Sequence, residues 1–261
     1  MTEWNASDYA HQSTLQQTMA EAQLAALTVA PNERVLDVGC GDGKVTAEIA
    51  LRVPQGAVLG VDPSHDMIAF ASQHFAGEKW RNLRFAVGDA RELSFREEFT
   101  LVVSFNALHW VHEQEKALQG IRAALKPGGR ALLRFVPEGE RKCLEDVIED
   151  TRQSPRWAAR FASFSRPYAH FTLDEFRALA ERSGLRVLSL QVEDFAWDFH
   201  TRAGFAAFCH ATFIAWTRRL PESDVPAFID DVLDRYRLVA ATTAAEANTF
   251  KYYQLEALLG R

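Results

Sequence analysis

The sequence predicts an α/β fold in which a parallel sheet carries helices on both faces. Three observations support this prediction. Between residues 34 and 136, five short apolar runs alternate with segments of helical periodicity, as in repeated strand–helix units. The runs are apolar throughout rather than at every second position, which is typical of strands buried on both faces. A glycine-rich turn, Gly39-Cys40-Gly41-Asp42-Gly43, follows the first run directly.

The first half of the chain supplies most of the predicted elements. Residues 13–29 place apolar side chains at helical spacing, and Pro31-Asn32 ends that helix. Lys126-Pro127-Gly128-Gly129 ends the last helix of the alternation. The predicted helices are 13–29, 44–52, 64–75 and 113–125, and the predicted strands are 34–38, 57–61, 83–87, 101–105 and 131–136.

After residue 136 the alternation gives way to segments that are mainly helical. Residues 140–163 have helical periodicity, which Pro155 can interrupt. Thr172 as N-cap and Gly184 just past the end delimit a helix over 173–183. The other predicted elements are helices at 205–219 and 225–239 and strands at 185–192 and 250–258.

Composition excludes several classes of protein. The 261 residues fit one large domain or one domain with an elaboration, and the net charge is −6, with 29 basic and 35 acidic residues. Because no region has a basic excess, we expect no nucleic-acid partner. No signal peptide and no run of about 18 apolar residues is visible, so we expect a cytoplasmic protein without a membrane partner. The cysteines, Cys40, Cys143 and Cys209, lack metal-ligand spacing, so no metal site is predicted.

The aromatic residues are unevenly distributed along the chain. Residues 1–134 contain 10 of them and residues 135–261 contain 19. A larger core could explain this excess, and so could an apolar pocket. Since the excess lies after the fifth strand, outside the predicted cofactor half, we expect some of these side chains to line an apolar substrate pocket.

The glycine-rich turn is the strongest functional signal. Glycines at a strand-to-helix turn allow a tight bend and the close approach of a ligand. Gly43-Lys44-Val45 lacks the hydroxyl residue of a phosphate loop, and the spacing is G-x-G-x-G rather than the dinucleotide pattern G-x-G-x-x-G. Asp37, two residues before the first glycine, would repel a pyrophosphate but suits a ligand with an ammonium group.

With these features the chain resembles the class I S-adenosylmethionine-dependent methyltransferases over residues 33–136. The resemblance implies a Rossmann-like sheet of seven strands, mostly parallel with an antiparallel last strand, and S-adenosylmethionine as the cofactor. It also implies three regions: a lid helix region at 1–30, a cofactor-binding core at 31–136, and cap helices with the last two strands at 137–261. The expected partner is a small-molecule substrate, and the expected oligomeric state is a monomer or homodimer.

The resemblance also implies the cofactor-binding residues. The acid after the second strand would accept the ribose hydroxyls, and the acid after the third would accept from the adenine amino group. Alternatives remain open: core packing for Met67, a turn or cap role for Asp89, and simple anchoring for the N-terminal aromatic residues. The full predicted set is Trp4, Tyr9, Gln12, Asp37, Gly39, Cys40, Gly41, Gly43, Asp62, Pro63, Met67, Gly88, Asp89, Ala90 and Asn106.

A narrower resemblance concerns the substrate. Trp4-Asn5-Ala6-Ser7-Asp8-Tyr9, Leu108-His109-Trp110, the segment 171–184 and Trp216…Leu220-Pro221 are similar to the trans-aconitate methyltransferase group and to juvenile hormone acid methyltransferases. This implies methylation of the carboxyl group of a small organic acid. The alternatives are another small-molecule O, N or C nucleophile, a non-catalytic cofactor-binding protein, or an oxidoreductase.

Candidate catalytic and substrate residues follow from that chemistry. The resemblance implies that His109 and Trp110, after the fourth strand, form the floor of the methyl-transfer site. A carboxylate is ionised at pH 7 and needs no general base, whereas an amine or hydroxyl does. His109 could be that base, a hydrogen-bond donor, or a structural histidine at the end of the strand. A carboxylate also favours a cationic partner. The predicted substrate residues are Arg134, Arg160, Tyr168, His200 and Trp216.

Overall fold

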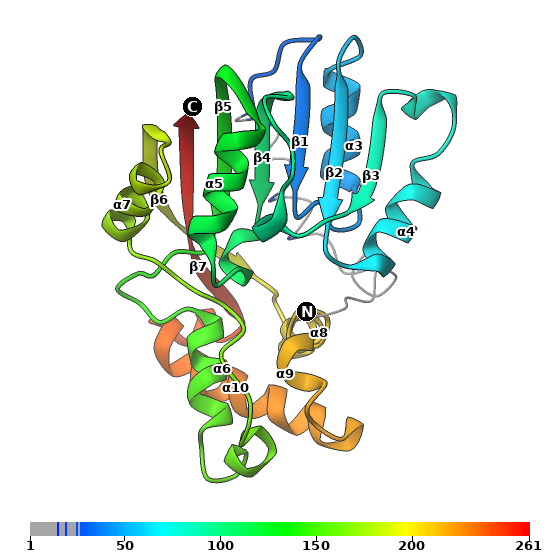
Figure 1. Ribbon diagram of the computed structural model, residues 1–261. Coiled ribbons are helices and arrows are strands. Elements are labelled where there is room, and N and C mark those ends of the chain that lie inside the picture. Colours follow the sequence, from blue (N-terminus) through cyan, green and yellow to red (C-terminus); the bar gives the residue numbers. More distant parts are fainter. Residues whose placement is uncertain (1–14, 16–18, 20–24, 26) are drawn as a thin grey trace.

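The computed structural model describes residues 15, 19, 25 and 27–261, and it confirms the predicted fold class. One sheet has the strand order β3-β2-β1-β4-β5-β7-β6 (Figure 1). Strands β1 to β5 pair in parallel, and β7 is antiparallel to both of its neighbours. The strands are β1 Arg34–Val38, β2 Ala57–Asp62, β3 Leu83–Val87, β4 Phe99–Phe105, β5 Leu125–Phe135, β6 Arg186–Asp198 and β7 Thr249–Gly260.

Helices cover both faces of the sheet and form a separate group beside it. The α-helices are α3 Lys44–Arg52, α4 His65–His74, α5 Gln114–Ala124, α6 Leu144–Arg152, α7 Leu173–Arg182, α8 Arg202–Thr212, α9 Ile214–Thr217 and α10 Val225–Ala240. Short 3-10 helices are η1 Glu78–Trp80, η2 Ala90–Glu92, η3 Leu108–Trp110, η4 Ala158–Phe161, η5 Glu222–Asp224 and η6 Ala244–Glu246. No helix among residues 27–261 is long and apolar enough to cross a membrane.

Two hydrophobic cores lie on opposite faces of the sheet. Helices α5 and α7 pack on one face, where Leu36, Leu118 and Phe176 are fully buried. Helix α3 packs on the other face, against Val35 and Leu101. In Figure 1, α5 lies in front of the strands and α3 behind them. Because the central strands lie between two helical layers and have no solvent-facing side, their sequences are largely apolar, as predicted. The edge strand β3 is the exception, because only Leu83 of its five residues is buried.

The last two strands are longer than the sequence predicted. The predicted strands 185–192 and 250–258 extend in the structure to Asp198 and to Gly260. Their antiparallel pairing continues to Trp197↔Phe250 and Asp198↔Thr249, beyond the ends of the parallel strands. This extension brings Phe195, Trp197 and Phe250 into contact with the helices beside the sheet.

We call the helices α6, α8, α9 and α10, with η4, the cap. Two predicted cap helices are interrupted: α6 ends at Arg152, ahead of Pro155, and the helix expected over 205–219 divides at Phe213. Proline removes a backbone donor and clashes with the preceding turn, which accounts for the first interruption. The cap core consists of large buried side chains, among them Trp157, Tyr168, Phe205, Phe228 and Tyr236. Most of the aromatic excess in residues 135–261 therefore belongs to a hydrophobic core, which is the first of the two explanations that the sequence offered. A substrate pocket lined by some of these side chains stays a prediction.

The carboxyl ends of β1 to β4 point toward the cap (Figure 1). Asp62 is the last residue of β2, and the loops after these strands contain the glycine-rich turn, Asp89 and Asn106. Parallel strands bring such loops together at one edge of the sheet, which is where ligands bind in open α/β folds. Of the predicted helix 13–29, Leu15, Met19 and Ala25 are described as helical, whereas residues 27–29 are described and are not helical, so the predicted end of this helix is wrong.

Candidate functional site

The glycine-rich turn after β1 is tightly packed at two of its three glycines. Gly39 and Gly43 both have φ near +80°, a left-handed conformation that side chains disfavour. A Cβ atom on Gly39 would lie 2.2 Å from the Cβ of Ala107, and one on Gly43 would lie 2.6 Å from the ring of Phe85. Gly41 also has a positive φ, but a Cβ there would meet no atom within 4 Å. The backbone at Gly41 therefore borders open space that a ligand can approach.

Asp37 is buried at the end of β1. Its Oδ2 accepts a 2.7 Å hydrogen bond from the hydroxyl of Thr46 on α3. Burial raises the pKa of Asp37 to about 7, and the nearby charge of Asp62 acts in the same direction. A cationic ligand group beside this carboxyl would favour its ionised form. The position of Asp37 therefore agrees with the prediction from the sequence that this carboxylate suits a ligand with an ammonium group.

Asp62 links the first two strand ends. Its Oδ2 accepts from the backbone N–H of Gly41 at 3.0 Å, and its Oδ1 accepts from that of Ser64 at 2.9 Å. The hydroxyl of Ser64 accepts from the N–H of Met67, and so caps the N-terminus of α4. Met67 is 3% exposed, which agrees with the core-packing alternative left open for it. These bonds hold the carboxylate at a defined place beside the glycine turn, where Cys40 and Pro63 flank it.

Asp89, which follows β3, has the cap role that the sequence analysis gave as an alternative to binding adenine. Asp89 caps η2 by accepting from the N–H of Arg91, and it pairs with the Arg91 guanidinium at 2.6 Å. The hydrogen bond from the Arg91 side chain is the main cause of a lowered pKa at Asp89. Gly88 donates its N–H to the carbonyl of Asp62, which ties this loop to the preceding one. Ala90 is buried directly after Asp89. Asp89 is therefore the N-cap residue of η2, and its contact with the adenine amino group stays a prediction.

Asn106 follows β4 in a left-handed conformation, with φ of +54°. Its backbone N–H donates to the carbonyl of Arg134 at 2.7 Å, and its Oδ1 accepts from Gln254 of β7 at 2.9 Å. A non-glycine residue adopts this conformation only when its surroundings stabilise it, and strain of this kind gathers at functional sites. The bonds to β5 and β7 supply that stabilisation.

Five ring-bearing residues meet just beyond β4, and we call them the η3 cluster: His109, Trp110, Tyr168, His170 and Trp216. The ring centroids of His109 and His170 are 6.0 Å apart, and those of Trp110 and Trp216 are also 6.0 Å apart. Tyr168 lies 4.4 Å from His170 and 6.2 Å from Trp216. The structure therefore brings together four of the predicted catalytic and substrate residues.

The loop that carries Tyr168 and His170 is held against η3 by backbone contacts. The N–H of Ala169 donates to the carbonyl of His109 at 2.8 Å. The amide of Gln114 donates to the carbonyls of Leu108 and Ala169, and so joins both segments. The two histidines are thus fixed side by side by main-chain bonds rather than by direct bonds between their rings.

Both histidines in the cluster are neutral at pH 7. Burial lowers the pKa of His109 well below its usual value, and His170 beside it acts in the same direction. Burial also lowers the pKa of His170 to about 4, against the opposing effect of Asp146. Nδ1 of His109 and Nε2 of His170 are buried without a hydrogen-bond partner among the described residues. Such orphaned groups are costly, and they commonly mark places where a ligand or water binds.

Carboxylates border the cluster on its cap side, and sequence reasoning missed them. Asp146 accepts a 2.9 Å hydrogen bond from the hydroxyl of Tyr168. Glu149 accepts from the indole N–H of Trp216 at 2.7 Å and from the guanidinium of Arg152. Helix α6 supplies both acids one turn apart, but no motif in the sequence pairs them with η3.

The remaining predicted substrate residues lie elsewhere. Arg134 is 5% exposed, and its Nε lies 3.2 Å from a carboxylate oxygen of Glu256 on β7. Arg160 is about half exposed and pairs with Asp224, while the exposed side chain of His200 pairs with Asp198. The structure gives Arg160 and His200 no place in the η3 cluster, because both pair with acids at the surface. Trp4, Tyr9 and Gln12 lie outside the described residues.

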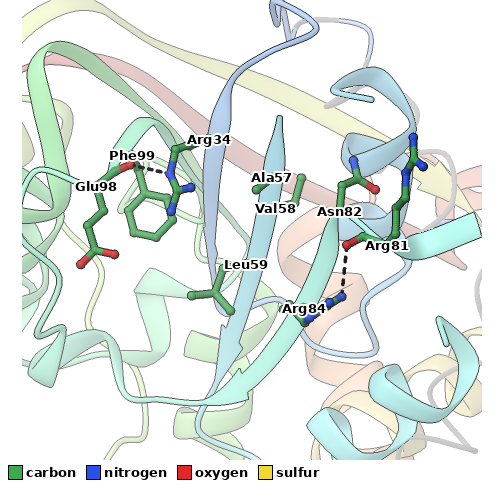
Figure 2. Close-up of a pocket in the computed structure, with 9 residues that line it drawn as sticks. All are labelled: Arg34, Ala57, Val58, Leu59, Arg81, Asn82, Arg84, Glu98 and Phe99. Atoms are coloured by element: carbon green, nitrogen blue, oxygen red, sulfur yellow. Dashed lines mark hydrogen bonds between the residues drawn. The ribbon is translucent and has the colours of Figure 1, made fainter. Parts of the chain in front are cut away.

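One cavity of about 290 Å³ lies far from this edge. It is bordered by the amino ends of β1 to β3 (Figure 2), and its lining includes Arg34, Leu59, Arg84 and Phe99. The motif residues lie at the carboxyl ends of the same strands. This cavity is therefore separate from the candidate site.

Known proteins resemble the chain in both sequence and fold. Residues 35–129 match the family described as "Methyltransferase domain". The chain is 30% identical over 192 residues to a malonyl-[acyl-carrier protein] O-methyltransferase from Geobacter sulfurreducens, a match that covers 72% of this chain and 70% of the relative. It is 36% identical over 126 residues to a trans-aconitate 2-methyltransferase from Deinococcus radiodurans, covering 48% of this chain and 46% of the relative.

A solved structure agrees at the level of the fold. Phosphoethanolamine N-methyltransferase 2 from Haemonchus contortus, in complex with S-adenosyl-L-methionine, superposes with a TM-score of 0.60 at 18% identity. The match covers 94% of this chain and 52% of that protein. Together with the buried Asp37, the Asp62 bonds and the open backbone at Gly41, these matches identify the chain. It belongs to the class I S-adenosylmethionine-dependent methyltransferases, with S-adenosylmethionine as its cofactor.

Proposed function

We propose that this methyltransferase acts on a small organic acid and converts a carboxylate to its methyl ester. The observation that carries the proposal is the pair of neutral histidines in the η3 cluster, with one unpartnered buried nitrogen each. The names of two relatives support it, since one acts on trans-aconitate and the other is an O-methyltransferase of malonyl-acyl-carrier protein.

The chemistry requires positioning more than activation. S-adenosylmethionine supplies an electrophilic methyl group on a sulfonium, which is displaced in line by the attacking oxygen. A carboxylate is already ionised at pH 7 and needs no base. Imidazole N–H groups of His109 and His170 orient the carboxylate by hydrogen bonds and leave its negative charge in place. Trp110 and Trp216 exclude water around the attacking oxygen, which strengthens these contacts.

The cofactor contacts of individual residues belong to the same proposal. Asp37 pairs with the ammonium group of the cofactor, and the backbone of Gly41 lies against its carboxylate end. Asp62, which is held in place by the N–H groups of Gly41 and Ser64, also accepts the ribose hydroxyls. Asp89 binds the adenine amino group, and Asn106 lies beside the methyl group of the cofactor. Trp4, Tyr9 and Gln12 belong to the proposed lid over the cofactor.

A second candidate is methylation of an amine. Asp146 and Glu149 lie beside the aromatic rings of Tyr168 and Trp216. Carboxylates next to aromatic faces attract ammonium groups. In that case neutral His109 accepts the proton that the amine must lose before it attacks.

The deciding experiment is a methyl-transfer screen with labelled S-adenosylmethionine. Di- and tricarboxylic acids, primary amines and phenols of matched size are tested side by side, and the products are treated with base to detect esters. We expect base-labile methyl esters from at least one acid. Turnover of an amine with no ester from any acid would reverse the order of the two candidates.

A further inference from the structure

We propose that Cys143, Asp146 and His170 form a binding site for a divalent transition-metal ion, with zinc as the best match. The three residues come from two segments, the N-terminus of α6 and the loop before α7. Their potential ligand atoms, a thiol sulfur, a carboxylate oxygen and an imidazole nitrogen, all lie within 4.8 Å of one another. This mixture of sulfur, nitrogen and oxygen donors is the set that zinc uses in proteins.

The two distances that involve the thiol are close to those around a tetrahedral ion. Sγ of Cys143 lies 3.1 Å from Oδ2 of Asp146 and 3.7 Å from Nδ1 of His170. Zinc bonds of about 2.0–2.3 Å in tetrahedral geometry separate the ligand atoms by about 3.3–3.6 Å. The observed spacings lie on either side of that range, so binding needs side-chain shifts of a few tenths of an ångström for the thiol pairs.

The identity of residue 143 is a second, independent observation. Cys143 is the N-cap of α6, where its Sγ accepts from the N–H of Asp146 at 3.4 Å and Asp146 accepts from the N–H of Cys143. Serine, threonine, aspartate and asparagine are the preferred side chains for this role, and sulfur is only a weak acceptor. Capping alone therefore does not account for a cysteine here, whereas a soft metal ligand does.

The surroundings also suit a metal. The hydroxyl of Tyr168 donates to Oδ1 of Asp146, which orients the carboxylate as outer-shell partners of metal ligands do. With the ion on Nδ1 of His170, the proton is carried by Nε2, which is buried without a partner among the described residues and so can donate to a bound substrate. Three protein ligands leave a fourth position open, the arrangement of zinc sites that also bind water or substrate.

Such an ion would add a cation to the η3 cluster, where the guanidinium of Arg166 already lies over the ring of Tyr168. Arg134 and Arg152 pair with Glu256 and Glu149. We infer that the open position of the metal binds a carboxylate of the substrate at the end remote from the methyl group. This role rests on the proposed function, whereas metal binding by the three residues does not.

The test is a titration of the full-length protein with Co²⁺, after metal removal by a chelator. Tetrahedral Co²⁺ with a thiolate ligand gives a charge-transfer absorption band, and Zn²⁺ should displace it. We expect one equivalent of metal per chain. Cys143→Ser keeps the helix cap but should lose the band, and Asp146→Asn and His170→Gln should weaken metal affinity at least tenfold. Cys209→Ala, which removes another buried cysteine, should keep the band.

Two results would overturn the site. One is a wild-type protein that takes up less than a tenth of an equivalent of Co²⁺ and of Zn²⁺ at micromolar free metal. The other is a band that survives in Cys143→Ser while circular dichroism shows this variant folded. Calorimetry with S-adenosylmethionine and the methyl-transfer screen, both run on the same samples, separate metal binding from the proposed ester formation. Metal uptake without ester formation would support the site and count against the proposed substrate class.

Discussion

The two candidate sites are assembled in opposite ways. One is the η3 cluster, and the other is the cofactor edge, by which we mean the carboxyl ends of β1 and β2 with the glycine-rich turn, Asp37 and Asp62. At the cofactor edge, Gly39, Gly41 and Asp62 lie within one strand–turn–helix unit and the strand beside it, and backbone groups make most contacts. In the η3 cluster, Trp110 and Trp216 lie more than 100 residues apart in the chain and their rings contact each other. The loop that carries Tyr168 and His170 is a third segment, which main-chain bonds hold against η3. A site built from backbone is recognisable as a motif, whereas a site built from distant side chains depends on the packing of the cap.

The largest effect is expected on the free energy of unfolding, and it distinguishes a glycine needed for packing, Gly39, from a glycine needed for the approach of the ligand, Gly41. Gly39→Ala forces a Cβ against Ala107 at a positive φ, and should cost about 3–5 kcal/mol of unfolding free energy. Gly41→Ala meets open space, and should cost only about 1 kcal/mol while weakening cofactor binding at least tenfold. Urea denaturation and calorimetry measure the two quantities. Equal stability losses would mean that the two glycines do not differ in role.

The next effect tests whether Asp62 belongs to the cofactor site. Asp62→Ala should weaken S-adenosylmethionine binding at least a hundredfold, because the proposed contacts to the ribose and the bonds to Gly41 and Ser64 are lost. Isothermal calorimetry measures the affinity, and a thermal melt confirms folding. Asp198→Ala, at an exposed position on β6, is the control and should bind normally. Unchanged affinity in Asp62→Ala would remove this residue from the site.

A pH effect of intermediate size should belong to the cofactor edge alone. Because burial raises the pKa of Asp37 from 3.8 to about 7, folding of the ligand-free protein favours the protonated carboxyl. Its contribution to stability is fully present below about pH 3.8 and is lost as pH rises through 7. The cofactor ammonium favours the ionised carboxyl instead, so affinity should rise about tenfold between about pH 6 and pH 8.

Calorimetry across that pH range measures the effect, and Asp37→Asn provides the control. The variant should bind S-adenosylmethionine weakly at every pH, and its ligand-free form should be more stable than the wild type at about pH 8. The η3 histidines should add no titration step in this range, because the pKa of His109 is lowered well below 6.5 and that of His170 to about 4. A pH dependence that persists in Asp37→Asn would assign the step to another group.

The smallest effects are expected where the structure departs from the predicted substrate residues. Arg160→Ala removes one partner of an exposed ion pair, and His200→Ala removes an exposed hydrogen bond to Asp198. Exposed contacts of this kind contribute about 0–1 kcal/mol. Neither variant should change the turnover of any substrate more than twofold. Steady-state kinetics measures this, and a tenfold loss in either variant would place that residue back in the substrate site.

Local pattern determined much of this protein. The strand runs and the glycine turn are properties of neighbouring residues, because a strand between two helical layers must be apolar and a left-handed turn must be glycine-rich. From these, five parallel strands and the glycine turn at their carboxyl ends could be predicted. The antiparallel last strand and the cofactor role of Asp62 were implied by the family resemblance. Strand ends were less certain, since β6 and β7 extend as far as their partner strand continues to pair.

Only the tertiary structure decided the pairing of side chains from distant segments. Arg160 and Arg152 have the same residue type, yet one pairs with Asp224 at the surface and the other with the buried Glu149. The triad of Cys143, Asp146 and His170 likewise exists only because the loop before α7 is bonded to η3. Composition and periodicity record which residues are present and which face they share. The contacts between segments depend on how the cap packs against the sheet, which is a property of the whole folded chain.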